Sequence, residues 1–259
     1  MNQETLSARL TERFIDKLAA SPRGRAHVLH QAADAEDSDE GELFRRLLSY
    51  VQDEELARLI RRHEADEKAH AKMFRACVER QGFTPPPVPE HLKLLHRIDH
   101  ALGRESGEAP KIESRDDVMR TYLVLQVIEE RATNQFRLFE RMFRRYDAAS
   151  ADVFAHVLKD EERHLRYCHA IARRYAPDSQ TQARVLAELR TIEARCFAEN
   201  SRANMDYVFE HGFVEASAVD KLFWRGVSRA SHALGVYQRT AFWGTPPAPA
   251  PSAQVLAAA

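Results

Sequence analysis

The sequence predicts an all-α protein. The 259-residue chain contains only 9 glycines and 11 prolines, while alanine, leucine, arginine and glutamate, which favour helix, are abundant. Apolar residues also recur at alternating spacings of three and four, which places them on one face of a helix. Hydrophobic residues make up 44% of the chain, enough for a sizeable core. Together these observations predict amphipathic helices along nearly the whole chain.

The first two helices are expected at residues 4–20 and 25–50. The first ends at the Ser-Pro-Arg-Gly stretch of residues 21–24, which favours a break. The acidic residues 37–39 can interrupt the second helix, because Asp and Ser side chains also cap a new helix start. Acidic residues near this interruption are therefore difficult to assign to one helical face.

A third long helix follows the turn at residues 52–53 and ends at residues 81–82, where a glycine follows the last periodic position. The proline-rich residues 84–89 then force an extended segment. Residues 82–116, with a short helix at 90–102, make a long connection. A four-helix bundle built from two helical hairpins needs such a crossover between its second and third helices.

The remaining chain is expected to form four more helices. They are predicted at residues 114–146, 151–175, 178–207 and 214–243. Ser114 and Asp178 can supply N-terminal caps, and Pro177 and Gly212 mark breaks. The expected organisation is an N-terminal helix and linker (1–24), a bundle (25–176), a helical extension packed on it (177–244) and a disordered Pro/Ala tail (245–259).

Charge and cysteine usage exclude several classes of partner. The net charge is −1, with 38 basic and 39 acidic residues, so neither a nucleic-acid face nor a polybasic membrane anchor is expected. No stretch resembles a secretory signal or approaches the ~20 apolar residues of a membrane span. The 3 cysteines are far apart and read as reduced thiols. These features predict a cytoplasmic protein.

One helical stripe carries polar residues where burial is expected. It contains Leu56, Ile60, His63, Glu67, His70, Phe74 and Cys77. Burying a carboxylate and imidazoles costs several kcal/mol unless they are compensated, and a divalent cation compensates a Glu and a His one turn apart. A single E-x-x-H motif is weak evidence, because it often arises by chance in a chain with 39 acids and 12 histidines.

The motif occurs a second time in the same register. Adding 94 to Ile60, Glu67 and His70 gives Phe154, Glu161 and His164, on a second apolar stripe. A dimetal site in a four-helix bundle needs one more carboxylate from a helix upstream of each motif. Glu129 fits this role for the second motif, because it interrupts an aromatic-rich stripe, whereas its neighbour Glu130 is the reserve candidate.

Three acids compete to be the carboxylate of the first helix. Glu36 is preferred, because it lies 31 residues before Glu67, close to the 32 that separate Glu129 from Glu161. Glu40, at 27 residues, is near the interhelical turn, and Asp34, at 33, stays open. His63 precedes Glu67 by four residues on the same stripe, so it is either an additional ligand or a histidine that only supports the site.

The pattern Glu36, Glu67-x-x-His70, Glu129, Glu161-x-x-His164 resembles the ferritin-like dimetal-carboxylate superfamily, over roughly residues 25–175. The resemblance implies a ferritin-like four-helix bundle, with the long crossover and extra C-terminal helices noted above. It implies two iron ions, or Mn/Fe or Mn/Mn, bridged by Glu67 and Glu161, with Glu36 and Glu129 terminal and one histidine on each ion. An added histidine such as His63 resembles the extra ligand of arylamine N-oxygenases, although it lies in the other half of the chain.

The function expected from this resemblance is that of an oxidoreductase. A dimetal oxidase or monooxygenase would use dioxygen and an external electron donor to oxidise a small organic substrate. No catalytic residue beyond the metal ligands is assigned. Aromatic residues of the C-terminal helices would shape a pocket or a homodimer interface. The alternatives are a ferroxidase or other iron-handling protein, a peroxide-reducing protein and a non-catalytic helical scaffold.

Overall fold

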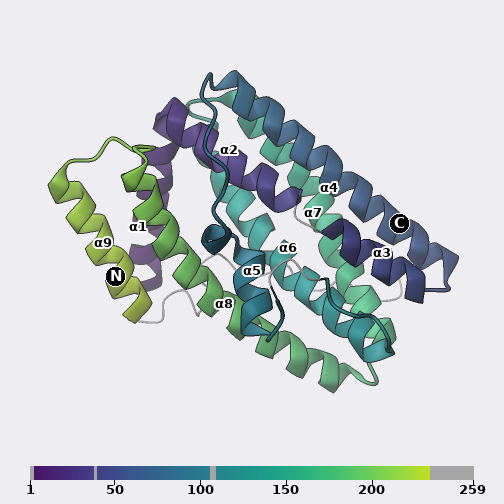
Figure 1. Cartoon of the computed structure of the whole chain (residues 1–259). Helices are drawn as coiled ribbons and strands as arrows, with labels where there is room; N and C mark the ends of the chain where they lie inside the picture. Colours follow the sequence, from purple (N-terminus) through teal and green to yellow (C-terminus); the bar gives the residue numbers. More distant parts are fainter. Residues whose placement is uncertain (1–2, 38–39, 106–108, 234–259) are drawn as a thin grey trace.

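The computed structural model describes residues 3–37, 40–105 and 109–233 (Figure 1). Within these ranges the chain forms α-helices, one short 3-10 turn and no strand, which confirms the predicted all-α class. The elements are α1 (Gln3–Ala20), α2 (Pro22–Glu36), α3 (Glu40–Tyr50), α4 (Glu54–Arg80), η1 (Glu90–Leu92), α5 (Leu94–Ala101), α6 (Arg115–Phe143), α7 (Ala148–Tyr175), α8 (Ser179–Glu210) and α9 (Ala218–Ala233). The predicted tail at 245–259, and the end of the last predicted helix, lie outside the described residues.

A bundle of α2, α4, α6 and α7 forms the centre of the molecule. Helix α2 packs along α4, α6 packs along α7, and α4 and α7 join the two pairs. Figure 1 shows α3 beyond the end of α2, along the same α4. The connection between α4 and α6 contains η1 and α5, as predicted. Each pair therefore contributes one helix with an E-x-x-H motif, α4 or α7, and one helix upstream of it.

Side-chain caps begin α4, α6 and α8, and the caps of α6 and α8 were predicted from the sequence. The Asp53 carboxylate accepts hydrogen bonds from the backbone N–H groups of Glu55 and Leu56, at 3.0 and 3.1 Å. Ser114 and Asp117 form a reciprocal capping box at the start of α6. The Asp178 side chain accepts a hydrogen bond from Thr181 N–H at 2.8 Å.

The start of α2 differs from the prediction. Pro22 opens the helix instead of separating it from α1, and Ser21 is its N-cap. Proline is tolerated in the first helical turn because the N–H it lacks has no partner there. The sequence suggested a start near residue 25, so the linker between α1 and α2 is shorter than expected. The interruption foreseen at residues 37–39 agrees with the end of α2 at Glu36 and the start of α3 at Glu40.

Two apolar clusters fill the bundle on either side of a polar layer. One contains Phe74, Phe136 and Phe154, and the other contains Ile60, Tyr122 and Cys168. On α4, α6 and α7, the residues seven before and seven after the acids Glu67, Glu129 and Glu161 fall in opposite clusters. The acids therefore lie in a layer that is closed at both ends by hydrophobic packing.

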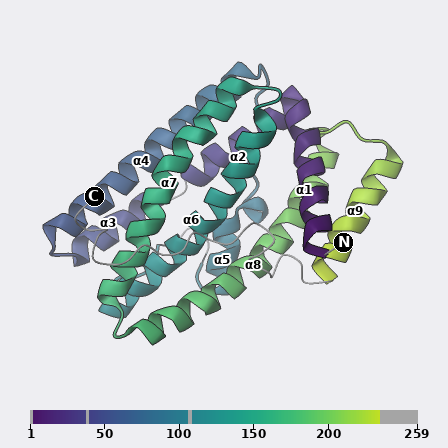
Figure 2. The ribbon, with the colours of Figure 1, turned by 180° about the vertical axis from the view of Figure 1, so that it is seen from behind.

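The remaining helices cover the α6 side of the bundle. Helix α8 packs on α6 and α5, α9 packs on α8, and α1 contacts both α2 and α6. Figure 2 shows α8 crossing the bundle, with α1 and α9 together at the end away from α3. Phe14 of α1 and Trp224 of α9 lie 5.4 Å apart between ring centroids. In the described part of the chain, no helix is long and apolar enough to cross a membrane.

Candidate metal centre

Helices α4 and α7 direct their motif residues into the polar layer. His63, His70, Glu161 and His164 are each at most 1% exposed, and the side chain of Glu67 is 12% exposed. Glu36, the last residue of α2, and Glu129, in the middle of α6, are also buried. All six preferred ligand candidates, together with His63, therefore lie in one interior region.

These seven residues form two groups with the donor types of a metal site. The first group is His63, Glu67, Glu129 and His164, and the second is Glu36, Glu67, His70 and Glu161. In each group, one oxygen or nitrogen from every residue lies within 4.8 Å of the others. Glu67 belongs to both groups, as expected of a carboxylate that bridges two ions.

Glu161 also faces both groups. Its Oε1 lies 3.6 Å from His70 Nδ1, and its Oε2 lies 3.5 Å from His164 Nδ1. Glu67 Oε1 is 3.1 Å from His63 Nε2 and 3.2 Å from His164 Nδ1. The two carboxylates of the E-x-x-H motifs thus lie between the histidines.

Several of these buried atoms have no hydrogen-bond partner among the described residues. They are Glu67 Oε1, both carboxylate oxygens of Glu161, and His164 Nδ1. They approach one another within ion-pair distance but outside hydrogen-bonding geometry. Leaving such groups unpaired in an interior is costly. Metal cations would satisfy them, so the residues present fit a pair of divalent ions.

The acids strongly perturb one another. Burial, and then the charges of Glu67 and Glu161, raise the pKa of Glu36 well above its ordinary value. Burial and the charge of Glu129 likewise raise the pKa of Glu161. Burial acts in the same direction on Glu67, but interactions with the rings of His164 and His63 outweigh it and lower its pKa to about 2. The layer therefore needs protons or cations to balance its negative charge.

Burial has the opposite effect on the pKa of the histidines. Burial lowers the pKa of His164, but Asp66 and the carboxylates of the layer outweigh burial and raise it well above its ordinary value. For His63, burial and the charge of His164 oppose Glu129 and Glu67, and the net pKa is raised. Without cations, His63 and His164 thus hold protons that balance the charge of the carboxylates.

Asp66 and Asp160 each contact the ring nitrogen Nε2 of a motif histidine, a role that the sequence analysis missed. His164 Nε2 lies 3.3 Å from Asp66 Oδ2, and His70 Nε2 lies 3.2 Å from Asp160 Oδ2. Arg163 contacts both aspartates. Each aspartate directly precedes the Glu of its own motif but contacts the His of the other. The repeated D-E-x-x-H pattern was the available signal, and such partners orient ligating histidines.

His63 contacts the centre through Glu129 of α6, and not through an aspartate of a motif helix. Its Nε2 lies 3.0 Å from Glu129 Oε1, while its Nδ1 is buried without a hydrogen-bond partner among the described residues. The ring packs 4.9 Å from the Phe44 ring and 4.1 Å from the His164 ring, between centroids. His63 therefore adds a third imidazole to the centre, on the side of Glu129.

The reserve candidates lie elsewhere or outside the described side chains. Glu130 accepts hydrogen bonds from Arg190 at 2.9 and 2.6 Å and from Gln126 at 3.0 Å, so it faces α8 and belongs to neither group. Adjacent helical residues point about 100° apart, and Glu129 takes the inward direction. Asp34 faces Lys93 at 3.7 Å instead of the centre. Glu40 starts α3, and its side chain is outside the described part.

A cavity of about 280 Å³ adjoins the centre. Its walls come from α1, α2, α6, α8, α9 and the segment around η1, and Glu36, Glu67 and Glu129 reach it. None of the three histidines in the two groups lines it. The cavity thus meets the centre on its carboxylate side.

No protein-family model, curated protein or solved structure matches this chain. The chemistry of the centre is therefore inferred from its own residues. Four carboxylates and three imidazoles, brought from four helices into a buried layer, form a donor set that could hold metal ions.

Proposed function

We propose that this chain is a ferritin-like dimetal oxidoreductase, of the oxidase or monooxygenase type. It would activate dioxygen beside a small organic substrate and take electrons from an external donor. The observation that carries the proposal is the pair of ligand groups sharing Glu67, with a largely apolar cavity against their carboxylates. Dimetal sites in four-helix bundles use this combination of residues.

The two groups suggest how each ion would be held. Glu36 and His70 would bind one ion, Glu129, His164 and His63 the other, and Glu67 and Glu161 would lie between them. Four carboxylates balance two divalent charges, so the loaded layer is close to neutral. When bound, iron or a manganese–iron pair supplies the redox chemistry that dioxygen reduction requires. Asp66 and Asp160 would keep the imidazoles of His164 and His70 in the ligating orientation.

The cavity favours an organic substrate over iron storage. Phe136 and Phe139 of α6 and Trp224 of α9 line it, together with aliphatic side chains of α1. A largely apolar cavity beside the centre would accommodate a small organic molecule. Ferroxidase activity requires only access for iron, and no feature of the cavity walls specifically favours it.

Oxygen uptake by the iron-loaded, chemically reduced protein tests the proposal. We expect uptake that increases when a panel of small aromatic and aliphatic compounds is added, with oxidised product detected by mass spectrometry. Glu161→Ala should abolish both signals, whereas Glu162→Ala, which alters the exposed neighbour on α7, should leave them unchanged. Uptake that follows only the amount of added ferrous ion would indicate a ferroxidase instead. The absence of metal-dependent uptake would contradict an oxygen-activating function.

A further inference from the structure

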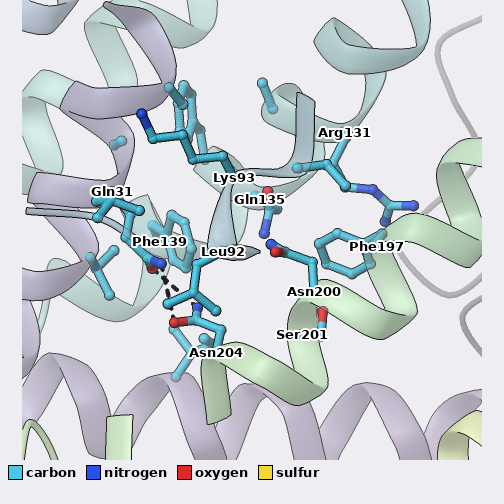
Figure 3. A pocket seen from close by; sticks show the side chains of 18 of the residues that line it. Gln31, Leu92, Lys93, Arg131, Gln135, Phe139, Phe197, Asn200, Ser201 and Asn204 are labelled. Atoms are coloured by element: carbon cyan, nitrogen blue, oxygen red, sulfur yellow. Dashed lines mark hydrogen bonds between the residues drawn. The ribbon is translucent and has the colours of Figure 1, made fainter. Parts of the chain in front are cut away.

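The walls of the cavity differ in polarity. One face of α8, Phe197, Asn200, Ser201 and Asn204, follows the helical spacing i, i+3, i+4, i+7 and lies opposite Gln135 of α6 (Figure 3). The other walls are largely apolar. Polar groups on one wall of an apolar pocket usually fix the orientation of a ligand.

The two basic side chains on the cavity walls, Arg131 and Lys93, are already paired with carboxylates. Arg131 Nε and Nη2 donate to the Glu193 carboxylate at 2.7 and 2.8 Å, and its guanidinium stacks on Phe197 at 3.9 Å. Lys93 Nζ lies 3.2 Å from Glu90 and 3.7 Å from Asp34. An anion would therefore meet basic side chains that are already compensated and would also approach the carboxylates Glu36, Glu67 and Glu129. A cation would lose its hydration in a mainly apolar cavity.

Two of the amide side chains differ in their hydrogen bonding. Asn204 is satisfied, because it exchanges hydrogen bonds with Gln31 at 3.1 Å and lies 3.1 Å from His27 Nε2. Asn200 Oδ1 is buried and has no hydrogen-bond partner among the described residues. Figure 3 shows the Asn200 amide facing that of Gln135 across the cavity. A buried amide oxygen without a donor is costly, so a ligand that donates to it would gain binding energy.

We propose that the cavity binds a neutral, mainly apolar organic molecule that carries one hydrogen-bond donor, a primary amide or a hydroxyl, held by Asn200. Taking ~30 Å³ as the share of one water molecule in the liquid, the cavity accommodates on the order of ten non-hydrogen atoms. The apolar body packs against the phenylalanines of α6 and extends toward Glu36, Glu67 and Glu129. The claim that this molecule is the substrate rests on the proposed function. The claim that the cavity binds it selectively does not.

A matched set of four probes tests the selection. They are 2-phenylacetamide, phenylacetate, 2-phenylethylammonium and propylbenzene, which share a ring and a similar size but differ in charge and hydrogen bonding. Binding to the metal-loaded full chain is measured by calorimetry. We expect 2-phenylacetamide to bind best, propylbenzene about tenfold more weakly, and both ions more weakly still. Tighter binding of either ion, equal binding of propylbenzene, or no binding of any probe would overturn the proposal.

Two variants, with a third as the control, test whether binding takes place in this cavity and at Asn200. Asn200→Leu should weaken 2-phenylacetamide about tenfold and leave propylbenzene unchanged, whereas Arg202→Leu, on the exposed side of α8, should change neither. Val227→Phe should exclude all probes, because Val227 lines the cavity from α9. Unchanged amide binding in Asn200→Leu would overturn the role of Asn200. If that variant does not fold, the order of the four probes on the unaltered chain still decides.

Metal content, measured first, separates this inference from the proposed function. A chain that holds no metal yet prefers the amide contradicts the oxidoreductase and supports the cavity assignment. A chain that holds two ions but prefers phenylacetate supports the dimetal centre and overturns the cavity assignment.

Discussion

At the residue scale, protons and metal ions compete for the same buried atoms. Glu36 and Glu161 have raised pKa values because they are buried beside other carboxylates, and His63 and His164 have raised pKa values because carboxylates outweigh the effect of their burial. Near neutral pH the metal-free layer therefore holds more protons than the same residues do in the unfolded chain. Divalent ions must displace these protons in order to bind.

This competition predicts a pH dependence with a definite sign. Stability from protonated His63 and His164 is fully present below their ordinary pKa of 6.5 and is lost as pH rises through their raised values. Glu36 and Glu161 act in the same direction above 4.5, whereas Glu67 and Glu129 add stability that is lost only at acidic pH. The melting temperature of the metal-free protein should therefore fall as the pH rises above about 6.5.

Metal binding should release protons over the same range. Calorimetric titration with divalent manganese, in buffers of different ionisation enthalpy, measures this release. The metal-loaded protein should show a flatter dependence of melting temperature on pH than the metal-free protein. A metal-free melting temperature that rises with pH, or binding without proton release, would contradict the electrostatic description of the layer.

His63 should strengthen the binding of one ion only. Replacement by alanine removes the third imidazole beside Glu129, so one of the two ions should bind about tenfold or more weakly. Iron content after gel filtration should fall from near two toward one per chain. His156→Ala, on the exposed side of α7, is the control. If both variants retain the same iron content, His63 only packs against the centre.

The sequence predicted the candidate metal ligands better than the aspartates that contact the ligating histidines. Stripe register and the spacing to Glu67 selected Glu36 among three acids, and the structure places it with the motif residues. Asp66 and Asp160 lie off the apolar stripes of their own helices, so the stripe register did not select them. Their partners are on the other motif helix, and the register of one helix does not report its contacts with another.

At the scale of elements, crosswise Asp–His contacts join α4 to α7. Asp66→Asn and Asp160→Asn should each preserve the fold and weaken metal binding about 10- to 100-fold, because the ligating imidazole loses its oriented partner. Arg163→Ala should affect both histidines. Asp152→Asn, an exposed change on α7, is the control. Metal affinities are measured by competition with a chelator, and wild-type affinity in both Asp variants would rule out this positioning role.

The turn between α1 and α2 depends on a glycine. A Cβ at Gly24 would lie 2.2 Å from the backbone oxygen of Leu18, so Gly24→Ala should destabilise the protein by about 1–3 kcal/mol. At Gly226 in α9 a Cβ would meet nothing within 4 Å, so Gly226→Ala should be neutral or stabilise by up to about 1 kcal/mol. Urea unfolding measures both values. Equal stability of the two variants would contradict the close approach of α1 and α2.

At the scale of the whole molecule, helices from both ends of the described chain complete the cavity. Phe14 of α1 and Trp224 of α9 meet beside α8, more than 200 residues apart in sequence. The sequence predicted these helices and the apolar surface of the C-terminal ones. It did not predict the position of the cavity, because that depends on how helices distant in sequence pack against α6. Local capping and periodicity fix elements, whereas a cavity is a property of tertiary packing.

The number of metal ions per chain, measured by mass spectrometry in the intact protein and in two variants of α4, tests the shared centre most directly. Wild-type protein grown in iron- and manganese-defined media should hold close to two ions. Glu67→Ala should lose both, because Glu67 belongs to both ligand groups, while Glu79→Ala, exposed on the same helix, should keep both. A wild-type chain without metal, or a Glu67→Ala variant that retains two ions, would contradict a dimetal centre at this layer.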